Sequence, residues 1–508
     1  MNFDSSFFLP EVREGFYIST SMKRFWAAQM EVLHRLIDVC IQNDIKIFVD
    51  YGTLLGAIRH EGFVPWDDDI DVVIFRKDQK RLYELLRREF MDEWELLESQ
   101  DERCLQPWYR INNSDAFLCD EDKIREFHGC VYPVGVDIYI LDNPPADNGE
   151  NEIVSAMIEM VYSLCYDENL TDWSKEKALS FMEECFNLRL KTDDFTQIKK
   201  VMLTIMQELM ASYDQNDSGD LIKLDGGGYS SKRYKTEWFN DMLWMPFENT
   251  YVPVPVGYEE VMAKSFGSGY MNVVIGGGMH DYPGFKELAE EYTRKTGIDH
   301  KYNVDNESLE KLYNSREYEK KNGQVILFLP YMASKWEYLE PYWLEASDNP
   351  KNQVYVIDVP VYKKDCMGRI DGLMEKEEYP DCVTFLSTDE FDPDQLEADV
   401  IYIQQPYDDM CDAFEVDRRF FSDTLREKCK QLVYVPDFRL MEFDSKDHIC
   451  YKTFEYFVPM PGVVNADKTI VQSENIRSMY IDYLCEWTGE NKHVFWEKKI
   501  QVSGVKDK

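Results

Sequence analysis

Two acidic residues at the start of an apolar segment carry the strongest chemical signal in this sequence. Asp69 and Asp71 alternate with apolar residues, so a strand through them would place both carboxylates on one face. Carboxylate oxygens on one rigid face are hard ligands of the kind that Mg²⁺ prefers, with Mn²⁺ as the alternative. Together with the Gly52-Thr53 turn ahead of it, this layout predicts a metal-dependent site for phosphoryl or nucleotidyl transfer.

Two carboxylates hold a metal loosely, and a third candidate lies in the segment 134–142, VGVDIYILD. Asp137 sits in the middle of this β-branched run, where a charged side chain is costly to bury unless it is paired or metal-bound. We therefore predict that Asp69, Asp71 and Asp137 form one constellation that is both the metal site and the catalytic centre.

Other interpretations of these acids remain open. The cluster 67–71 would be a solvated acidic turn in a chain with 96 Asp and Glu residues, although it leads directly into an apolar strand. A calcium-binding EF-hand loop is excluded, because it would need Gly where Val72 stands and Glu where Asp78 stands. For Asp137 alone, the alternative is a carboxylate at a sheet edge or in a loop.

Several nearby residues are candidates for substrate binding. Gly52 and Thr53 would follow a strand at 45–49 and present backbone N–H groups to a phosphate at a helix start, although most Gly-Thr pairs are ordinary turns. Arg59, His60 and Arg76 are cations close to the acids in sequence and are predicted to contact the phosphates of a donor. The alternative for each cation is a surface ion pair with a local acid.

Two aromatic residues and one histidine complete the set of candidates. Trp66 and Trp108 are able to stack on a cytosine or on a choline-like cation, with simple packing as the alternative. His280 follows three glycines, which would let the backbone approach a ligand closely. Without further support, the segment around His280 would be interpreted as a flexible loop.

These residues also carry a family resemblance. The segment YGTLLGAIRHEGFVPWDDDIDVVI resembles the signature of the LicD family, whose relatives include the fukutin-related phosphotransferases. The later YPVGVDIYILD resembles that family's third-carboxylate strand, and ENTYVPVPVGYEEVMAKSFGSGYM, followed by His280, resembles the close of its domain. The resemblance covers roughly residues 8 to 300 and implies a nucleotidyltransferase-like fold.

The resemblance also implies a reaction, the transfer of a phosphorylated alcohol from a CDP-linked donor to a hydroxyl of a cell-surface glycan or polyol-phosphate polymer. We expect Asp69 and Asp71 to hold Mg²⁺ against the diphosphate and Asp137 to complete the site and accept the proton of the acceptor, with CMP as the leaving group. Two alternatives remain: a nucleotidyltransferase that uses a free NTP and releases pyrophosphate, and a non-catalytic protein that binds a glycan or a partner.

Composition excludes several classes of partner. The chain has 508 residues and a formal net charge of −40, which disfavours binding to nucleic acid or docking on anionic lipid. No apolar run reaches the length of a transmembrane segment, and the 12 cysteines show no zinc-like spacing. We therefore expect a cytoplasmic protein that meets any lipid-linked acceptor peripherally, at the inner face of the membrane.

The pattern of strands predicts an α/β protein with two domains. Residues 1–316 would form an α+β nucleotidyltransferase-like domain. Residues 323–508 would form a Rossmann-like domain with a doubly wound parallel sheet, because strand-length apolar segments at 325–329, 354–359, 383–386, 400–403, 432–435 and 469–472 are separated by helix-length segments.

The second domain carries a resemblance of its own. Its segments ADVIYIQQPYDD and ADKTIVQSENIRSMY resemble the N-terminal half of CDP-glycerol glycerophosphotransferases. In that family a second lobe holds the nucleotide, so this half alone is not expected to catalyse transfer. Residues 405–408 are predicted either to line an acceptor crevice at the carboxyl edge of the sheet or to form a structural turn.

Overall fold

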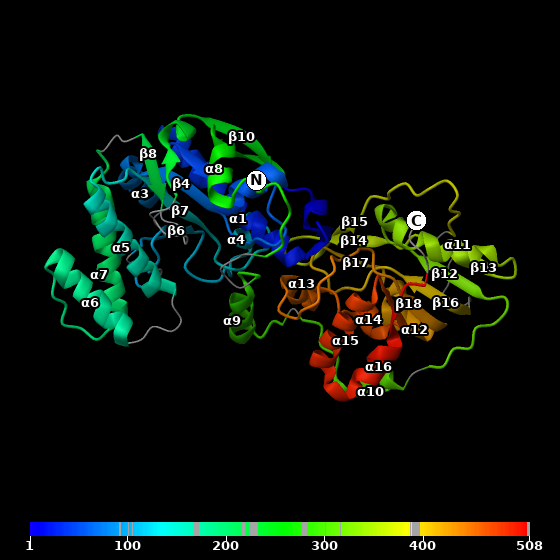
Figure 1. Ribbon diagram of the computed structural model, residues 1–508. Helices are drawn as coiled ribbons and strands as arrows, with labels where there is room; N and C mark the ends of the chain where they lie inside the picture. Colours follow the sequence, from blue (N-terminus) through cyan, green and yellow to red (C-terminus); the bar gives the residue numbers. More distant parts are fainter. Residues whose placement is uncertain are drawn as a thin grey trace. The chain divides into compact units, whose positions relative to one another are not determined.

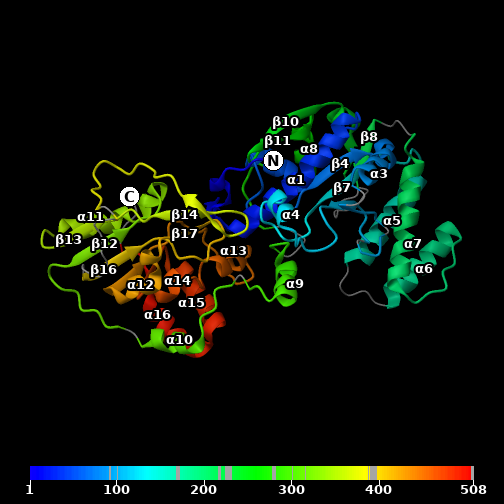
Figure 2. The same ribbon diagram turned by 180° about the vertical axis from the view of Figure 1, so that it is seen from behind.

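The computed structural model confirms an α/β protein (Figures 1 and 2). It describes residues 1–90, 93–99, 101–103, 105–166, 172–215, 219–223, 232–276, 282–299, 301–314, 316–386, 388 and 397–504. The chain divides into two compact units. Unit 1 comprises Met1, Phe25–Cys119 and Cys130–Ile275, and unit 2 comprises Asn2–Arg24, Asp120–Gly129 and Gly276–Lys508.

A mixed seven-stranded sheet forms the centre of unit 1, with the order β3-β4-β7-β6-β5, and with β8 and then β9 added beside β7. Only β4 and β7 pair in parallel, and both are almost fully buried because the sheet is covered on both faces at its centre. The strands are β3 (Ile47–Val49), β4 (Asp71–Phe75), β5 (Glu95–Leu97), β6 (Tyr109–Asn112), β7 (Gly135–Asp142), β8 (Asp220–Lys223) and β9 (Tyr234–Lys235).

Helices and a hairpin complete the part of unit 1 around this sheet. The apolar stripe at 22–43 forms the long helix α1 (Thr20–Gln42), whose buried face includes Trp26 and Met30. The helix α2 (Tyr51–Arg59) follows β3, and α3 (Arg76–Phe90) follows β4. A two-stranded hairpin and one further helix close the unit: β10 (Met242–Phe247), β11 (Thr250–Pro255) and α8 (Tyr258–Phe266).

Three helices of unit 1 share a separate apolar core. They are α5 (Asn148–Tyr166), α6 (Asp172–Phe186) and α7 (Phe195–Ser212), which lie side by side in both ribbon views. Met157, Met202 and Met206 are buried at their centre. The segment 153–213, whose apolar spacing predicts helices, therefore forms a small helical cluster of its own, because those residues pack on one another.

Unit 2 is built on a six-stranded sheet in which every neighbouring pair of strands is parallel. The sequence locates five of the six strands, with small shifts at their ends. The exceptions are the segment 383–386, which makes only an isolated bridge through Phe385 to Val356, and the last strand, which sequence reasoning missed. The strands are β12 (Val325–Leu329), β13 (Gln353–Val356), β16 (Ala398–Ile403), β18 (Cys429–Tyr434), β19 (Lys468–Val471) and β20 (Ile500–Val502).

The strand order β13-β12-β16-β18-β19-β20 is that of a doubly wound sheet. The chain moves outward from β12 to β13 and then crosses back to build the rest of the sheet in sequence order. Helices connect most of these strands, as expected for parallel neighbours, although among the described residues no helix lies between β13 and β16. Those that matter below are η3 (Ala333–Tyr338) and α11 (Glu340–Asp348) after β12, α12 (Ser422–Glu427) before β18, and α15 (Glu474–Thr488) and α16 (His493–Lys499) between β19 and β20.

Smaller elements complete unit 2. The strands β1 (Glu11–Arg13) and β2 (Phe16–Ile18) form a hairpin near the N-terminus, and a three-stranded antiparallel sheet consists of β14 (Val361–Lys364), β15 (Ile370–Leu373) and β17 (Phe414–Val416). The remaining helices include α4 (Glu121–Glu126), α9 (Lys286–Thr296), α10 (Asn306–Tyr313), α13 (Ile449–Lys452) and α14 (Pro461–Asn465).

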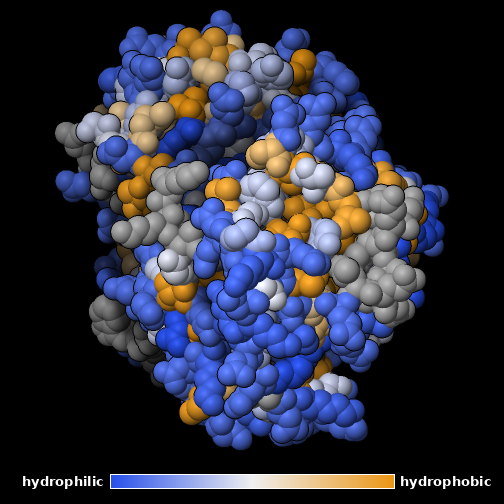
Figure 3. All heavy atoms as spheres, turned by 90° about the vertical axis from the view of Figure 1, so that its right-hand side faces the viewer, coloured by the Kyte–Doolittle hydropathy of each residue, from blue (hydrophilic) through white to orange (hydrophobic). Residues whose placement is uncertain are grey.

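These units are defined by packing, whereas the boundary predicted at 317–323 separates two kinds of fold, and that boundary stays a prediction. Figure 3 shows one face of the molecule that is mostly hydrophilic with small apolar patches, in keeping with the net charge of −40. Among the described residues, we find no helix that is both long and apolar enough to cross a membrane.

Candidate active site

The acids predicted to be catalytic come together at the centre of the unit 1 sheet. Asp71 is the first residue of β4 and Asp137 lies directly beside it on the parallel strand β7. Both residues are buried, at 6% and 7% exposure. Residues at the same register on neighbouring strands point to the same face, so the sheet places these two carboxylates side by side.

Asp69 reaches the same region from a different element than predicted. The strand begins at Asp71, so Asp69 belongs to the preceding loop. Its charge nevertheless acts on both strand acids and raises the pKa of each. The loop is fastened to α1, because Trp26 Nε1 donates to the Asp67 carbonyl at 3.0 Å and Gln29 Nε2 to the Asp68 carbonyl at 3.0 Å.

Burial and mutual repulsion disfavour the charged form of the two strand acids. Burial, and then the charges of nearby carboxylates, hold the pKa of Asp71 well above its usual range. Burial also raises the pKa of Asp137, against the opposing effect of Arg110. Crowded, buried carboxylates of this kind are costly unless a positive charge compensates them. In order of their effect, the carboxylates that act on Asp71 are Asp69, Asp137, Asp67 and Asp50.

The residues present fit a hard divalent cation in type. All of the candidate donors are carboxylate oxygens, which suit Mg²⁺. As they stand, no three acidic, histidine or cysteine side chains of the described residues lie close enough together to hold a metal. Arg110 Nη1 donates to Asp137 Oδ1 at 2.9 Å and so provides a positive charge beside this acid. The metal-binding role of Asp69, Asp71 and Asp137 therefore stays a prediction.

Two cations near the acids were missed by sequence reasoning. Arg110 lies on β6 opposite Asp137, and Lys223 on β8 forms a fully buried ion pair with Asp50, next to the rings of Tyr51 and Tyr234 at 3.9 and 4.8 Å. The backbone N–H of Asp50 in turn donates to the Asp71 carbonyl at 3.0 Å. Strand register places Arg110 opposite Asp137, whereas Lys223 reaches Asp50 from β8 across 173 residues of sequence. The sequence carries no local signal of either pair.

The Gly52-Thr53 turn forms the start of α2, as the sequence predicts, but its contacts are specific. Thr53 Oγ1 accepts from the Asp71 backbone N–H at 2.9 Å, so this side chain positions the strand acid. At Gly52, an added Cβ would lie only 2.0 Å from Asp67 Oδ2, so the position has room for no side chain. The backbone N–H groups of Gly52 and Thr53 belong to the first turn of α2, where a helix offers no internal acceptor for its N–H groups.

The cations predicted to contact a donor have other partners. Arg59 Nη1 donates to the carbonyls of Tyr270 and Asn272 at 3.1 and 3.0 Å, and Arg59 Nε donates to His60 Nδ1 at 3.4 Å. Arg59 therefore fastens the segment after α8 to α2. A role for Arg59 or His60 in substrate binding stays a prediction.

Arg76 has a structural position. Its guanidinium forms a two-pronged pair with Asp142, at 2.6 and 2.9 Å, and donates to Gln207 at 3.0 Å. The side chains of Arg76 and Asp142 are 4% and 1% exposed, so the pair connects α3, β7 and α7 inside the unit. The contact is an ion pair, but it is buried and its acid is distant in sequence, so it differs from the surface pair with a local acid that was the alternative; contact of Arg76 with a donor stays a prediction.

Trp66 and Trp108, the two aromatic residues predicted to contact the substrate, lie in different surroundings. Trp66 is buried, with its ring 6.1 Å from that of His60, which favours packing. The half-buried Trp108 lies 5.1 Å from Tyr139, whose ring is 4.9 Å from that of Tyr51, and its side chain hydrogen-bonds to Asp137. These three rings form an aromatic wall beside the acids. His280 lies outside the described residues.

The wall also carries a backbone feature of functional sites. Tyr51 has a φ of +42°, a region that bulky residues rarely adopt. Such conformations persist where the surrounding structure fixes them, and they cluster at active sites. The sequence contains no signal of this strain.

Comparison with known proteins assigns this sheet to a family. Residues 44–143 match the family model described as the LicD/FKTN/FKRP nucleotidyltransferase domain. These residues form a LicD-family domain. The match spans β3 to β7 and includes Asp69, Asp71, Arg110 and Asp137, whereas Lys223 lies outside it. The resemblance stated from the sequence motifs is confirmed over this segment.

Relatives support the same assignment. The chain is similar to the lipopolysaccharide cholinephosphotransferase LicD of Haemophilus influenzae, with 26% identity over 250 residues, which are 48% of this chain and 89% of the relative. Uncharacterized proteins of Rickettsia prowazekii and Rickettsia typhi are 42% and 40% identical over 57 residues, or 11% of this chain and 20% and 18% of theirs. The predicted resemblance of 323–508 to CDP-glycerol glycerophosphotransferases stays a prediction.

The crevice predicted at 405–408 in unit 2 is a tightly bonded turn. Gln405 Oε1 accepts from the N–H groups of Tyr407 and Asp408, both at 2.9 Å. The Asp408 carboxylate accepts from the N–H and hydroxyl of Ser422, at 3.0 and 2.6 Å. Since these buried polar atoms bind one another, the structure favours the alternative of a structural turn.

Proposed function

We propose that the chain is a LicD-type phosphotransferase that moves a phosphorylated alcohol from a CDP-linked donor to a hydroxyl of a cell-surface glycan. The observation that carries the proposal is the pairing of Asp71 with Asp137 on the two parallel strands of the LicD-family domain. The named relative, a lipopolysaccharide cholinephosphotransferase that the chain matches over 89% of its length, supports phosphocholine as the first group to test.

In the proposed reaction, the acceptor oxygen forms a bond to the phosphorus that carries the alcohol. The bond from that phosphorus to the bridging oxygen breaks, and CMP leaves with the electron pair. Asp137, buried beside Asp71, has the raised pKa that suits a proton acceptor from the attacking hydroxyl. Phosphoryl transfer needs charge neutralisation and alignment more than covalent help.

The other groups of the site have roles in binding. Asp69, Asp71 and Asp137 would hold Mg²⁺, which would neutralise charge on the diphosphate when bound. The backbone N–H groups at the start of α2 suit a phosphate. The rings of Tyr51, Trp108 and Tyr139 suit the base or the alcohol of the donor. The Asp50–Lys223 pair fastens the start of α2 to β8, and the backbone N–H of Asp50 fastens it to the Asp71 carbonyl at the start of β4.

The test is a nucleotide-release assay with purified protein, Mg²⁺ and a glycan acceptor, offering CDP-choline, CDP-glycerol, CDP-ribitol and CTP separately. We expect CMP from one CDP-alcohol. Asp71→Asn should reduce the rate by about 100-fold or more, because it removes a carboxylate that would hold Mg²⁺ against the diphosphate. Asp115→Asn, an exposed acid of the same unit, is the matched control and should release CMP at the wild-type rate.

The same assay separates the alternatives. Pyrophosphate from CTP would instead support a nucleotidyltransferase. If neither CMP nor pyrophosphate appears with any donor while the protein still binds glycan, the binding-protein alternative would replace the proposal. Metal removal by a chelator should abolish release, and Mg²⁺ or Mn²⁺ should restore it.

A further inference from the structure

A pocket of unit 2 lies where ligands bind in doubly wound proteins. It is bounded by residues at the carboxyl ends of three strands: Val435 after β18, Gln472 after β19 and Ser503 after β20. Binding sites of open α/β sheets lie outside this edge. The pocket is lined by residues of unit 2, whereas the acids of the proposed active site belong to unit 1.

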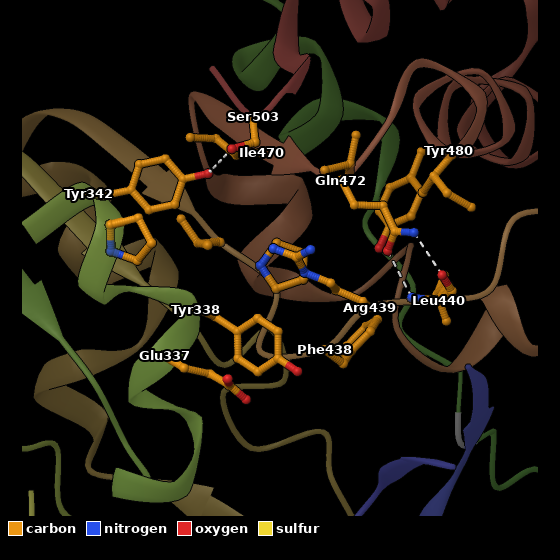
Figure 4. A pocket seen from close by; sticks show the side chains of 15 residues that line it. Glu337, Tyr338, Tyr342, Phe438, Arg439, Leu440, Ile470, Gln472, Tyr480 and Ser503 are labelled. Atoms are coloured by element: carbon orange, nitrogen blue, oxygen red, sulfur yellow. Dashed lines mark hydrogen bonds between the residues drawn. The ribbon is translucent and has the colours of Figure 1, made fainter. Parts of the chain in front are cut away.

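The walls of the pocket are mainly aromatic. Tyr338 of η3, Tyr342 of α11, Phe438 of the loop after β18 and Tyr480 of α15 all line it, and Figure 4 shows their rings around a common space. Tyr480 is buried, while the other three are half-buried and exposed on the pocket side. Binding sites for small molecules combine apolar walls of this kind with a few placed polar groups.

The polar groups of the rim are held in place by the protein itself. The Gln472 side chain pairs with the backbone of Leu440: its Oε1 accepts from the Leu440 N–H at 2.8 Å, and its Nε2 donates to the Leu440 carbonyl at 2.7 Å. The hydroxyls of Tyr342 and Ser503 lie 2.7 Å apart. A rim fixed in this way loses little side-chain freedom when a ligand binds.

One cation faces this space. Arg439 is exposed and extends from the loop after β18 toward the middle of the pocket, between the tyrosine rings and Gln472 (Figure 4). Its charge opposes the effect of burial on the pKa of Tyr338, which also places the guanidinium near that ring. A guanidinium binds phosphate or carboxylate through two parallel hydrogen bonds.

Size limits the ligand. The pocket has a volume of about 60 Å³, and by this measure one water needs roughly 10 to 15 Å³. The space therefore admits about four to six non-hydrogen atoms, enough for a short polyol or for part of a sugar, with the phosphate at the mouth. It is too small to enclose a whole nucleotide.

We propose that this pocket binds a small phosphate monoester of a polyol or sugar, with Arg439 on the phosphate and the aromatic walls and the rim of Gln472 around the alcohol part. The site does not depend on the proposed transfer reaction. It gives unit 2 a ligand of its own, at a sheet edge formed by strands other than those that carry the acids of unit 1.

The test is isothermal titration of the full chain, free of added metal, with glycerol phosphate and ribose phosphate as ligands and with inorganic phosphate and ribose as comparison probes. We expect a phosphate ester to bind more tightly than either part alone. Arg439→Gln should weaken the binding about tenfold, the effect of losing one charged hydrogen-bonded contact. The control Arg419→Gln removes an exposed guanidinium that pairs with Asp417 and should bind as wild type does.

Several results would overturn the proposal. Equal affinity of wild type and Arg439→Gln would place the ligand elsewhere, and absence of binding by both esters would remove the site. Inorganic phosphate that binds as tightly as the esters would rule out a pocket for the alcohol part. Asp71→Asn should bind the esters with wild-type affinity, so failure of the transfer reaction and failure of this pocket are distinguishable.

Discussion

At the scale of single residues, unit 1 concentrates like charges where a folded protein would normally avoid them. Asp71 and Asp137 are buried side by side, and burial and neighbouring acids raise the pKa of Asp71. Arg110 pairs with one of these acids, and Lys223 compensates the nearby Asp50. Buried carboxylates that repel one another lower stability. Their partial compensation by cations is typical of active sites, where function requires groups that are unfavourable for folding.

The sequence predicts the acids better than their partners. Asp137 is recognisable because a lone charge interrupts an apolar strand, and the pairing with Asp71 follows once both strands are placed in one sheet. Arg110 and Lys223 are not recognisable. Arg110 meets Asp137 across the β6–β7 pair, whose register no local pattern fixes, and Lys223 meets Asp50 from β8, 173 residues away in sequence. Arg76 looks like a donor contact by sequence distance, yet its partner Asp142 is 66 residues away.

The Arg76–Asp142 pair gives a prediction at this scale. Arg76→Met should cost roughly 3 to 5 kcal/mol, because it leaves the Asp142 carboxylate buried without its cation. Native-state hydrogen exchange of the β4 and β7 amides measures this loss as a lower opening free energy. Arg76→Met combined with Asp142→Leu should recover most of it, since no charge is then left unpaired.

A control on the same helix keeps this prediction specific. Arg88 of α3 is 69% exposed and pairs only loosely with Glu89, at 3.3 Å, so Arg88→Met should change the opening free energy by less than about 0.5 kcal/mol. If Arg76→Met exchanged as slowly as the wild type, the pair would contribute nothing to stability, and the interpretation of Arg76 as a structural residue would be wrong.

At the scale of elements, the parallel sheet of unit 2 is largely predictable because its central strands are buried on both faces. β12 is a continuous apolar run of strand length, and β16 is one after Asp399. The prediction fails at 383–386, which has the composition of a strand but makes only one bridge. It also misses β20, whose residues Ile500–Val502 are too few to stand out from the helix before them.

The turn after β16 gives a prediction of pH dependence. Burial raises the pKa of Asp408 from 3.8 to about 7, although hydrogen bonds from Ser422 and Gln405 act to lower it. Between about pH 4 and pH 7 the folded chain therefore keeps a proton that the unfolded chain has released. The free energy of unfolding should fall as the pH rises through this window, by at most roughly 1.4 kcal/mol per pH unit, and level off above it.

Asp408→Asn tests this directly, because an amide does not titrate and Asn tolerates the φ of +51° at this position. As the pH rises through the window, the unfolding free energy of the wild type should fall relative to that of the variant, so the difference between the two proteins should shift in favour of Asp408→Asn. The exposed neighbour Asp409→Asn should keep the wild-type slope. Parallel profiles for wild type and Asp408→Asn would show that Asp408 does not hold the proton.

At the scale of the whole molecule, the order of the sequence and the division into compact units differ. Residues Asn2–Arg24 and Asp120–Gly129 pack with the C-terminal half of the chain in unit 2. Arg24, for example, donates to the carbonyls of His128, Asp365 and Asp412. No composition shift marks these segments, so a boundary placed where the strand pattern changes cannot locate them.

This arrangement predicts the behaviour of a chain cut at the sequence-based boundary. A fragment of residues 1–316 would lose partners of the buried strand β2, whose residues Phe16, Tyr17 and Ile18 are at most 3% exposed in the full chain. The Tyr17 ring packs 4.5 Å from Phe457 and 5.4 Å from Phe438, and all of these contacts would be lost. Burial of each such side chain contributes roughly 1.5 to 3 kcal/mol, so the fragment should bind a hydrophobic dye and self-associate in size-exclusion chromatography.

The matched control is the same fragment with Phe16→Ser, Tyr17→Ser and Ile18→Ser, which removes the exposed apolar surface and leaves the LicD-family domain intact. It should bind less dye and elute closer to a monomer, because the three side chains are the apolar part of strand β2. A monomeric, dye-free 1–316 fragment would show instead that the β1–β2 hairpin is stable without the rest of unit 2. In that case the strand pattern near 317–323, and not the packing, would mark the unit that folds by itself.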